Sequence, residues 1–256
     1  MKFNFSFNQK VRSLQLFNHF LAILGISYCF YTKSIDPLVL SVFVYWVVGL
    51  LGISIGLHRL LSHRSFSTYP FVEKLLSLIS VITTLGSPIA WLSAHRTHHS
   101  RSDKDGDPHS PHLVGNFKAW FGFWNMKNVD IRYSKDLRKE DFQRFIHKNY
   151  FKIIFSYCFL LFLIDPILVI FVYAIPACFC FHATSSVVVI AHRQGYRNHF
   201  LKNDKSKNSW ITSLITLGDG WHNNHHARPW KWSNWEKWWE IDIPAIIIFL
   251  LRKRNA

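Results

Sequence analysis

Apolar residues fall into long blocks that are separated by polar segments. Residues 14–31 and 37–57 form two such blocks, and at about 1.5 Å per residue a helix of either length crosses about 30 Å of hydrocarbon. A later block, 149–191, is too long for one crossing, and Asp165 before Pro166 supplies a turn because the residue before a proline is biased away from helix. We therefore predict four membrane-spanning helices in two hairpins, at approximately 14–31, 37–57, 150–164 and 167–191.

The apolar stretch 71–92 lies between two groups of histidines, and their positions decide how it runs. One group precedes it and the other follows it, namely His58 with His63, and His95 with His98 and His99. A single crossing would put the two groups on opposite sides of the membrane. Because Pro88 breaks the helix near the end of the stretch, we expect 71–92 to be an interfacial or partly submerged helix that returns to the side it left.

Two further segments are expected at the membrane surface. Residues 132–148 mix both charge signs with apolar side chains, which favours a surface helix on the headgroups. Residues 241–251 are apolar but too short to cross, and they follow a tryptophan-rich segment that is typical of the interface. The predicted fold is an all-α integral membrane protein. It is one domain, 1–256, with four spans and a cytosolic cap that carries the histidines.

Composition agrees with a membrane protein and argues against a nucleic-acid partner. Hydrophobic residues make up 49% of the chain, and the formal net charge is +15. The basic residues lie beside apolar blocks, as the excess of Lys and Arg in cytoplasmic loops predicts. We therefore expect both termini and the histidine groups on the cytoplasmic side. Lys2, Lys10 and Arg12 precede the first apolar block without a small-residue cleavage site, so we interpret that block as an uncleaved span.

Histidine and cysteine are distributed very differently along the chain. The four cysteines all lie in apolar stretches without a Cys-x-x-Cys pair, which predicts neither a disulfide framework nor a zinc ribbon. Eight histidines form three runs, His58-x₄-His63, His95-x₂-His98-His99 and His222-x₂-His225-His226. Helical spacing brings residues four apart onto one face. Because eight imidazoles exceed the ligands that one ion takes, we predict two metal ions. Imidazole suits iron, zinc, copper or nickel, so the ligand type alone leaves the metal open.

Carboxylates accompany these runs. Asp103, Asp105 and Asp107 follow the second run and Asp219 precedes the third. They are candidates to accept the second ring N–H of a ligating histidine, with solvated loop residues as the alternative. Among the other histidines, His19 and His182 fall in spans and are expected to be packed or hydrogen-bonded. Loop or interfacial positions are expected for the rest, His109, His112, His147 and His199.

Several motifs together resemble a known family. They are Gly56-Leu-His-Arg-Leu-Leu-Ser-His-Arg-Ser-Phe66, Gly86-Ser-Pro-Ile-Ala-Trp91, His95-Arg-Thr-His-His99, Ser102-Asp-Lys-Asp-Gly-Asp-Pro-His-Ser-Pro111, Ala191-His-Arg-Gln-Gly-Tyr196 and Gly218-Asp-Gly-Trp-His-Asn-Asn-His-His226. The chain is similar to membrane-bound fatty acid desaturases of the acyl-CoA delta-9 (stearoyl-CoA) type, in their bacterial form. The resemblance implies two iron ions (Fe²⁺) that use O₂ and two electrons to form a cis double bond in a long acyl chain. Such carbon–hydrogen bonds are not acidic, so a general base would not suffice.

The same resemblance implies a ninth ligand, His192, and a bent apolar tunnel lined by Trp91 and Thr184. Two positions depart from the family pattern. Val188 and Val189 replace the Asn and Ser of an Asn-Ser-x-x-His element, whose asparagine contacts one metal through a water. Ser185 replaces a tryptophan of the tunnel wall, so we expect a wider tunnel near the bend and an altered regioselectivity or substrate.

Partners and alternatives remain open at this stage. The chain has no iron–sulfur, flavin or cytochrome b5 motif, so electrons are expected from a separate ferredoxin, rubredoxin or cytochrome b5 type donor. The basic residues of 132–148 and 252–254 would dock such a donor or contact anionic lipid. The acyl group is carried by coenzyme A, a carrier protein or a membrane lipid. The alternative functions are a hydroxylase with a similar centre and a membrane metal transporter or sensor, which is disfavoured because transporters hold ligands near mid-span.

Overall fold

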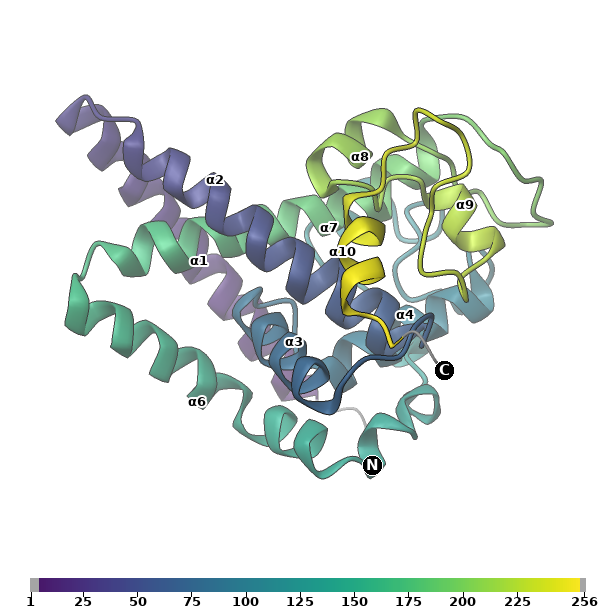
Figure 1. Cartoon of the computed structure of the whole chain (residues 1–256), viewed down its shortest axis with the longest axis horizontal. Helices are drawn as coiled ribbons and strands as arrows, with labels where there is room; N and C mark the ends of the chain where they lie inside the picture. Colours follow the sequence, from purple (N-terminus) through teal and green to yellow (C-terminus); the bar gives the residue numbers. More distant parts are fainter. Residues whose placement is uncertain (1–4, 254–256) are drawn as a thin grey trace.

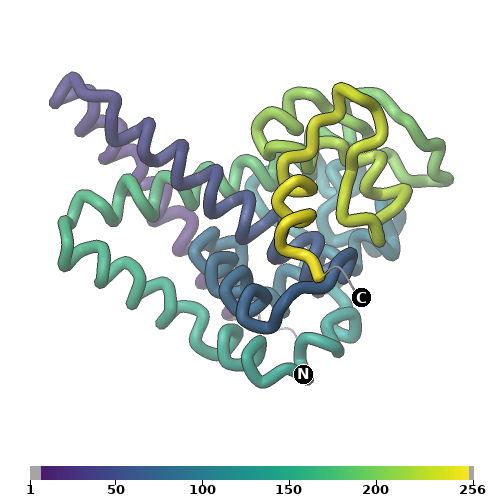
Figure 2. The backbone as a smooth tube through the Cα atoms, viewed as in Figure 1, coloured from purple at the N-terminus to yellow at the C-terminus, as the bar shows by residue number. Residues whose placement is uncertain are grey.

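The computed structural model describes residues 5–253, and over that range the chain is all-helical, with only isolated bridges of Asn208 to Tyr196 and to Trp221 in place of a sheet (Figure 1, Figure 2). The long helices are α1 (Phe5–Thr32), α2 (Asp36–Val48) continued by η1 (Gly49–Ser62), α3 (Pro70–Ile82), α4 (Pro88–Arg101), α6 (Asp141–Ile164), and η5 (Val169–Ala174) continued by α7 (Ile175–Arg193). The short elements are α5 (Asn116–Trp120), η2 (Met126–Asn128), η3 (Ile131–Ser134), η4 (Leu137–Lys139), α8 (Trp210–Thr216), α9 (His222–Ala227) and α10 (Ile243–Leu251).

Three described helices are long and apolar enough to cross a membrane: Phe7–Thr32, Asp36–Ser62 and Val169–Arg193. They overlap the first, second and fourth predicted spans, with bounds that differ by one to seven residues. The third predicted span, 150–164, lies within α6 but is not among them, because α6 begins nine residues earlier and carries charged side chains at Asp141, Arg144, Lys148 and Lys152.

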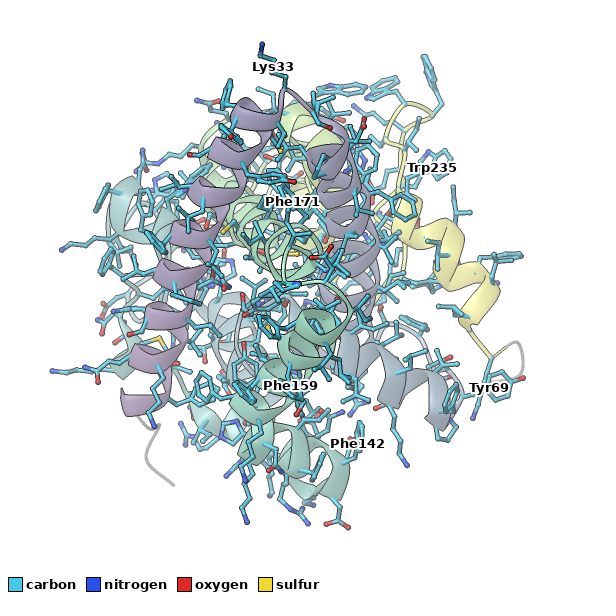
Figure 3. All side chains as sticks on the ribbon, turned by 90° about the vertical axis from the view of Figure 1, so that its left-hand side faces the viewer. Lys33, Tyr69, Phe142, Phe159, Phe171 and Trp235 are labelled. Atoms are coloured by element: carbon cyan, nitrogen blue, oxygen red, sulfur yellow. The ribbon has the colours of Figure 1, made fainter. Side chains whose placement is uncertain are left out.

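The α1–α2 and α6–α7 turns lie at one end of the molecule, opposite the cap that holds α9 (Figure 1). Figure 3 views that end, with Lys33 of the α1–α2 turn labelled. Large apolar side chains of the helices that lead to these turns are exposed: Phe30 is 80% exposed, Phe155 72% and Ile164 76%. Large apolar side chains that are exposed along long helices in this way are typical of a lipid-facing belt.

The second candidate span changes its winding before the first histidine run. Residues Gly49–Ser62 form a π-helix, and the amide of His63 donates to the carbonyl oxygen of His58 at 3.1 Å. In an α-helix, residues five apart point about 140° away from each other. The i to i+5 hydrogen bonds of a π-helix bring them nearly into line, so both imidazoles lie on one face, with ring centroids 5.1 Å apart.

The prediction of one interfacial helix over 71–92 is wrong, because the stretch forms two helices. α3 ends at Ile82, and α4 begins at Pro88 with the Ser87 side chain accepting from the amide of Ala90. The chain reverses between them through Gly86, whose φ of +107° favours glycine. The proline that signalled a break in the sequence therefore starts the helix that carries the second histidine run.

α3 lies close against the π-helix η1. A Cβ atom at Gly56 would come within 3.2 Å of the Leu76 carbonyl oxygen, and one at Gly52 within 3.1 Å of Ser80 Cα. α3 therefore packs directly against the end of the second candidate span.

The expected surface helix over 132–148 is also wrong. The segment forms the short turns η3 and η4 and then enters α6 at Asp141. Polar contacts explain this, because Asp136 is bound by both terminal nitrogens of Arg96 at 2.9 Å, and Arg96 also donates to the Ser62 carbonyl oxygen at 2.6 Å. The part of the segment before α6 is thus fastened to the histidine-bearing helices.

The C-terminal part of the cap is held by one buried carboxylate. Glu240 accepts from the side chains of Asn224, Asn198 and Tyr196 at 2.5 to 2.8 Å. α10 has nine residues, which confirms that this segment is too short to cross. Arg252 stacks over Trp232 at 4.7 Å, whereas Arg254, like Lys2 at the other end, lies outside the described residues.

Candidate metal centre

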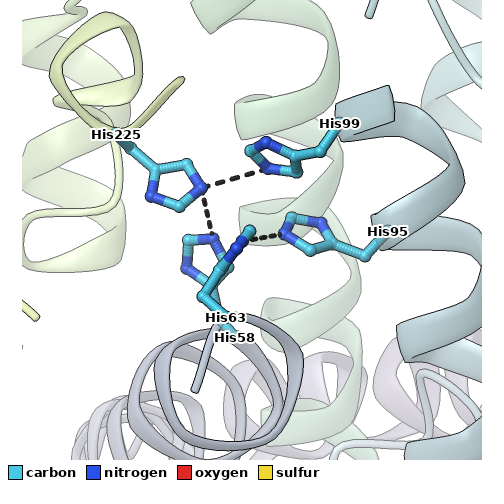
Figure 4. Close-up of side chains that lie close together, drawn as sticks. All are labelled: His58, His63, His95, His99 and His225. Carbon is cyan, nitrogen blue, oxygen red and sulfur yellow. Dashed lines mark hydrogen bonds between the residues drawn. The ribbon is translucent and has the colours of Figure 1, made fainter. Parts of the chain in front are cut away.

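The structure brings nine histidines of the predicted site together in two groups. Five form one group, which we call the five-histidine group: His58, His63, His95, His99 and His225 (Figure 4). Four form the other, the four-histidine group: His98, His192, His222 and His226. In each group one ligand atom per residue lies within 4.8 Å of all the others. The groups share no histidine, so the chain offers two separate sites.

Helical spacing divides two of the runs between the groups. On α4, His95 and His99 are four residues apart and share a face that points into the five-histidine group, whereas His98 points into the other. On α9 the arrangement is reversed, because His222 and His226 enter the four-histidine group and His225 enters the five-histidine group. A His-x-x-His-His run on one helix therefore serves both sites.

Carboxylates fix the ring orientation in the four-histidine group. The Nδ1 atoms of His98, His192 and His226 lie 2.8, 2.9 and 2.6 Å from Asp107, Asp103 and Asp204. An ionised carboxylate only accepts, so each Nδ1 carries the proton and each Nε2 presents a lone pair. The Nε2 atoms of His192 and His226 converge on that of His222 at 3.1 and 3.0 Å.

This spacing is that of ligands on a common ion. With a metal–nitrogen bond of about 2.1 Å, two ligand atoms at right angles lie about 3.0 Å apart. Lone pairs that face each other repel unless a cation or a shared proton lies between them. The donor set of the four-histidine group therefore fits a metal ion.

The five-histidine group has equally short Nε2 separations, 2.9 Å from His58 to His225, 3.1 Å from His225 to His99 and 2.7 Å from His63 to His95 (Figure 4). The hydrogen-bonding partners of its Nδ1 atoms are different. Asp219 lies 3.8 Å from His58 Nδ1 and is itself bound by Ser54 at 2.5 Å and Arg59 at 3.0 Å. The buried Nδ1 atom of His225 has no hydrogen-bond partner among the described residues.

Burial keeps most of these rings neutral. Desolvation, followed by the neighbouring imidazoles, lowers the pKa of His63, His95 and His99 well below its usual value, and those of His222 and His225 likewise. His98 is the exception: burial opposes its charge, but contact with Asp107 raises its pKa. Neutral imidazole is the form that binds a metal.

Of the four candidate aspartates, Asp103 and Asp107 accept from ring nitrogens and Asp219 lies 3.8 Å from one. Asp105 is exposed on the same loop as Asp103 and Asp107. Sequence reasoning missed Asp204. It belongs to the polar loop 194–209, far from any histidine run, and no local pattern distinguishes it from a solvated residue. Burial opposes its ionisation, yet the hydrogen bond from His226 lowers the pKa of Asp204.

The remaining histidines lie outside both groups. The prediction that His19 and His182 are hydrogen-bonded is confirmed, with their Nε2 atoms 3.1 Å apart and Trp120 donating to His182 Nδ1 at 3.0 Å. His109 lies on a loop, as expected, but it is buried against His98 with ring centroids 4.4 Å apart. The Ser87 hydroxyl lies 2.6 Å from His147, and Glu236 lies 2.7 Å from His199.

Two adjoining cavities reach the histidines. The first is lined by His95, His98, His192 and His222 at one end and by apolar residues of α2, α7 and α8 elsewhere. The second extends between α1, α4, α7 and the segment 121–126 that follows α5. Trp91, Ala94, Trp124 and Thr184 line both cavities. The predicted tunnel residues Trp91 and Thr184 therefore lie where the two cavities meet.

The two departures from the family pattern have different surroundings. Val188 lines the first cavity and packs with Val189 against Ala119 of α5. Ser185 lines the second cavity, and its hydroxyl donates to the Trp120 carbonyl oxygen at 2.7 Å. The position of α5 thus fills part of the space beside both residues.

Comparisons with known proteins agree with this centre. Residues 37–246 match the family described as fatty acid desaturase. The chain is 32% identical to an sn-1 stearoyl-lipid 9-desaturase of Anabaena variabilis over 83% of this chain and 79% of the relative. It is 33% identical to an sn-2 palmitoyl-lipid 9-desaturase of Nostoc sp. (strain 36), over 92% and 85%. It is 32% identical to an acyl-CoA 5-desaturase of Anemone leveillei, over 86% and 70%.

A family match over most of the chain, an all-histidine pair of sites and helices able to cross a membrane agree with one another. The chain therefore belongs to the fatty acid desaturase family and is an oxidoreductase that desaturates fatty acyl chains.

Proposed function

We propose that this enzyme introduces a cis delta-9 double bond into a long acyl chain, using O₂ and two electrons from a separate donor, at a centre of two iron ions. The observation that carries the proposal is the pair of all-histidine groups at the end of an apolar cavity. The relatives named as 9-desaturases support the position of the double bond.

The nine histidines would hold the metals, and bound iron with O₂ would supply the oxidising power that an unactivated methylene pair requires. Asp103, Asp107 and Asp204 hold protons on the Nδ1 atoms of their histidines, which leaves the Nε2 lone pairs of those three rings available to a metal ion. Asp219 supports His58 through a longer contact of 3.8 Å.

The cavities supply substrate positioning. An acyl chain that lies in the first cavity passes between Trp91 and Thr184 beside the histidines, and its apolar walls exclude water from the reacting carbons. A change of direction where the two cavities meet would fix one methylene pair near the metals. Because two of the reported relatives are named for lipid-bound substrates, we propose a glycerolipid as the acyl carrier.

The same proposal includes the topology. α6 serves as the fourth span beside the three candidate spans, its charged first turns lying at the interface. Four spans put the histidine groups and both termini on one side, and the basic excess of the chain favours the cytoplasmic side.

Expression in a desaturase-deficient host tests this function directly. We expect monounsaturated C16 and C18 chains with the double bond at delta-9, located by mass spectrometry, and no such product from the His98→Ala variant. Hydroxylated chains would instead identify a hydroxylase. Unchanged fatty acids with altered metal uptake would contradict an enzymatic role.

Substitutions at Ser185 test whether this side chain limits the width of the tunnel. Replacement by tryptophan should narrow the second cavity and lower conversion of the longer chains several-fold, because the side chain lines that cavity. Ser185→Ala is the matched control, since it removes only the hydrogen bond to Trp120, worth about 1 kcal/mol. Equal chain-length profiles for the tryptophan variant and the control would show that Ser185 does not limit the tunnel.

A further inference from the structure

We propose that the groove formed by the loop 194–209 and the end of α7 is the docking surface for an acidic one-electron carrier protein. We call it the basic groove. It rests on the proposed function, because the reaction draws electrons from outside the chain. Removing two hydrogen atoms from the acyl chain and reducing one O₂ to two waters requires two more electrons and two protons, and one-electron carriers deliver those electrons in two encounters.

The basic groove is strongly positive. Residues 193–207 include five basic side chains, Arg193, Arg197, Lys202, Lys205 and Lys207, against one acidic side chain. That acid, Asp204, is turned inward and bound to His226 at 2.6 Å, so it offers little negative charge to a partner. Phe200 stands within this positive surface and is 91% exposed. A basic rim around an exposed aromatic ring is complementary to an acidic carrier with an apolar contact area.

The floor of the groove touches ligands of the four-histidine group. His192 itself contributes to the lining, and His112 Nε2 lies 3.0 Å from the His192 carbonyl oxygen. A second connection runs from the backbone amide of Lys205 to Asp103 at 2.8 Å and from Asp103 to His192 Nδ1 at 2.9 Å. A carrier seated here is therefore separated from a candidate ligand by one or two hydrogen bonds.

The position of the groove favours a protein over a lipid. The loop 194–209 lies at the end of the molecule opposite the α1–α2 and α6–α7 turns (Figure 1), so it points away from the apolar belt. The basic surface of 132–148 differs, because its arginines Arg132 and Arg144 are paired with Asp130 and Asp141. We therefore place the donor on the loop 194–209 and not on 132–148.

Oxidation kinetics of a reduced carrier test the proposal. The purified full-length enzyme, loaded with iron in nanodiscs of neutral phosphatidylcholine, is mixed with a reduced plant-type [2Fe–2S] ferredoxin, an acidic probe, in the presence of O₂ and acyl lipid. We expect Arg197→Glu/Lys202→Glu to lower the second-order rate of ferredoxin oxidation at least tenfold at low ionic strength, with the difference shrinking as salt screens the charges.

The matched control is Lys135→Glu/Lys139→Glu, which makes the same charge change at two exposed lysines of the other basic surface. We expect less than a twofold effect from it. With reduced methyl viologen as a small electron source, wild type and both variants should desaturate equally and retain equal iron. Phe200→Ser should slow ferredoxin oxidation at high salt as well, because it removes an apolar contact.

Each contrary result has a definite meaning. Equal effects of the two double variants, or a larger effect of the control, would overturn the location. A wild type that desaturates with methyl viologen but does not oxidise ferredoxin would overturn the acidic carrier. Loss of binding to anionic vesicles by Arg197→Glu/Lys202→Glu, with unchanged ferredoxin kinetics, would identify a lipid surface instead. Only a failure with both electron sources would contradict the proposed function itself.

Discussion

The two histidine groups differ in how the protein supports them. In the four-histidine group, three of the four rings bind a carboxylate through Nδ1. In the five-histidine group, one carboxylate, Asp219, lies near one ring at 3.8 Å and is more closely bound to Arg59. The site with fewer ligands therefore has more direct carboxylate support.

Helix packing contributes to both groups. Ring centroids approach to 4.2 Å between His58 and His225 in the five-histidine group and to 4.3 Å between His222 and His226 in the four-histidine group. In the four-histidine group, a hydrogen bond at Nδ1 also fixes the tautomer and the ring plane of three rings. Loop carboxylates therefore add a constraint to one group that the other largely lacks.

The largest effects should come from removing one ligand of each group from the same helix. His222→Ala and His225→Ala on α9 should each lower desaturation by more than about 100-fold, because loss of a ligand exceeds the cost of losing its outer partner. Metal analysis should show one iron lost in each case, from different groups. His199→Ala, on the surface of the same cap, is the control. Loss of both irons from either variant would mean that the groups are not separate sites.

A smaller effect, on stability, should come from the buried ion pairs below the five-histidine group. Arg59 is 1% exposed and lies 3.0 Å from both Asp219 and Asp242. Arg59→Met leaves two buried carboxylates without their cation, and we expect a loss of about 3–5 kcal/mol in the free energy of unfolding, measured by denaturant titration in detergent. Arg132→Met breaks an exposed pair with Asp130 and should change stability little. Similar losses of stability for Arg59→Met and Arg132→Met would contradict the expectation that the buried ion pairs below the five-histidine group stabilise the fold.

The smallest effect should come from one carboxylate of the four-histidine group. Asp204→Asn removes the acceptor that holds the proton on His226 Nδ1, and we expect about 10–100-fold weaker iron binding at one of the two sites, measured by chelator competition. Asp105→Asn changes an exposed side chain on another loop of the cap and should leave the iron affinities of both sites unchanged. Equal weakening at both sites would show that Asp204 supports the whole centre and not one group.

The sequence predicted those features that depend on long blocks and local spacing. The first span, which contains Gly25, and the fourth, which contains Phe171, could be predicted from the length of their apolar blocks. The metal-binding role of the histidines could be predicted because the same kind of run occurs three times. The stretch 71–92 was mispredicted because its break at Pro88 is a local signal whose consequence, a new helix, depends on packing against η1.

Other features require the three-dimensional structure. The π-helical winding that aligns His58 with His63 has no distinct residue pattern. His95 and His99 serve one site and His98 the other because different elements pack against the two faces of α4, and the sequence does not show which elements these are. Asp204 reaches His226 only because the loop 194–209 folds back over α9, and a single sequence does not show that return.

The central claim is that the chain has two separate and inequivalent all-histidine metal sites, which we propose to hold iron. Mössbauer spectroscopy of the purified enzyme loaded with ⁵⁷Fe²⁺, combined with metal analysis, tests it most directly. We expect two iron ions per chain and two quadrupole doublets of equal area, one for each group. One iron per chain, or a single doublet from two equivalent ions, would contradict the claim.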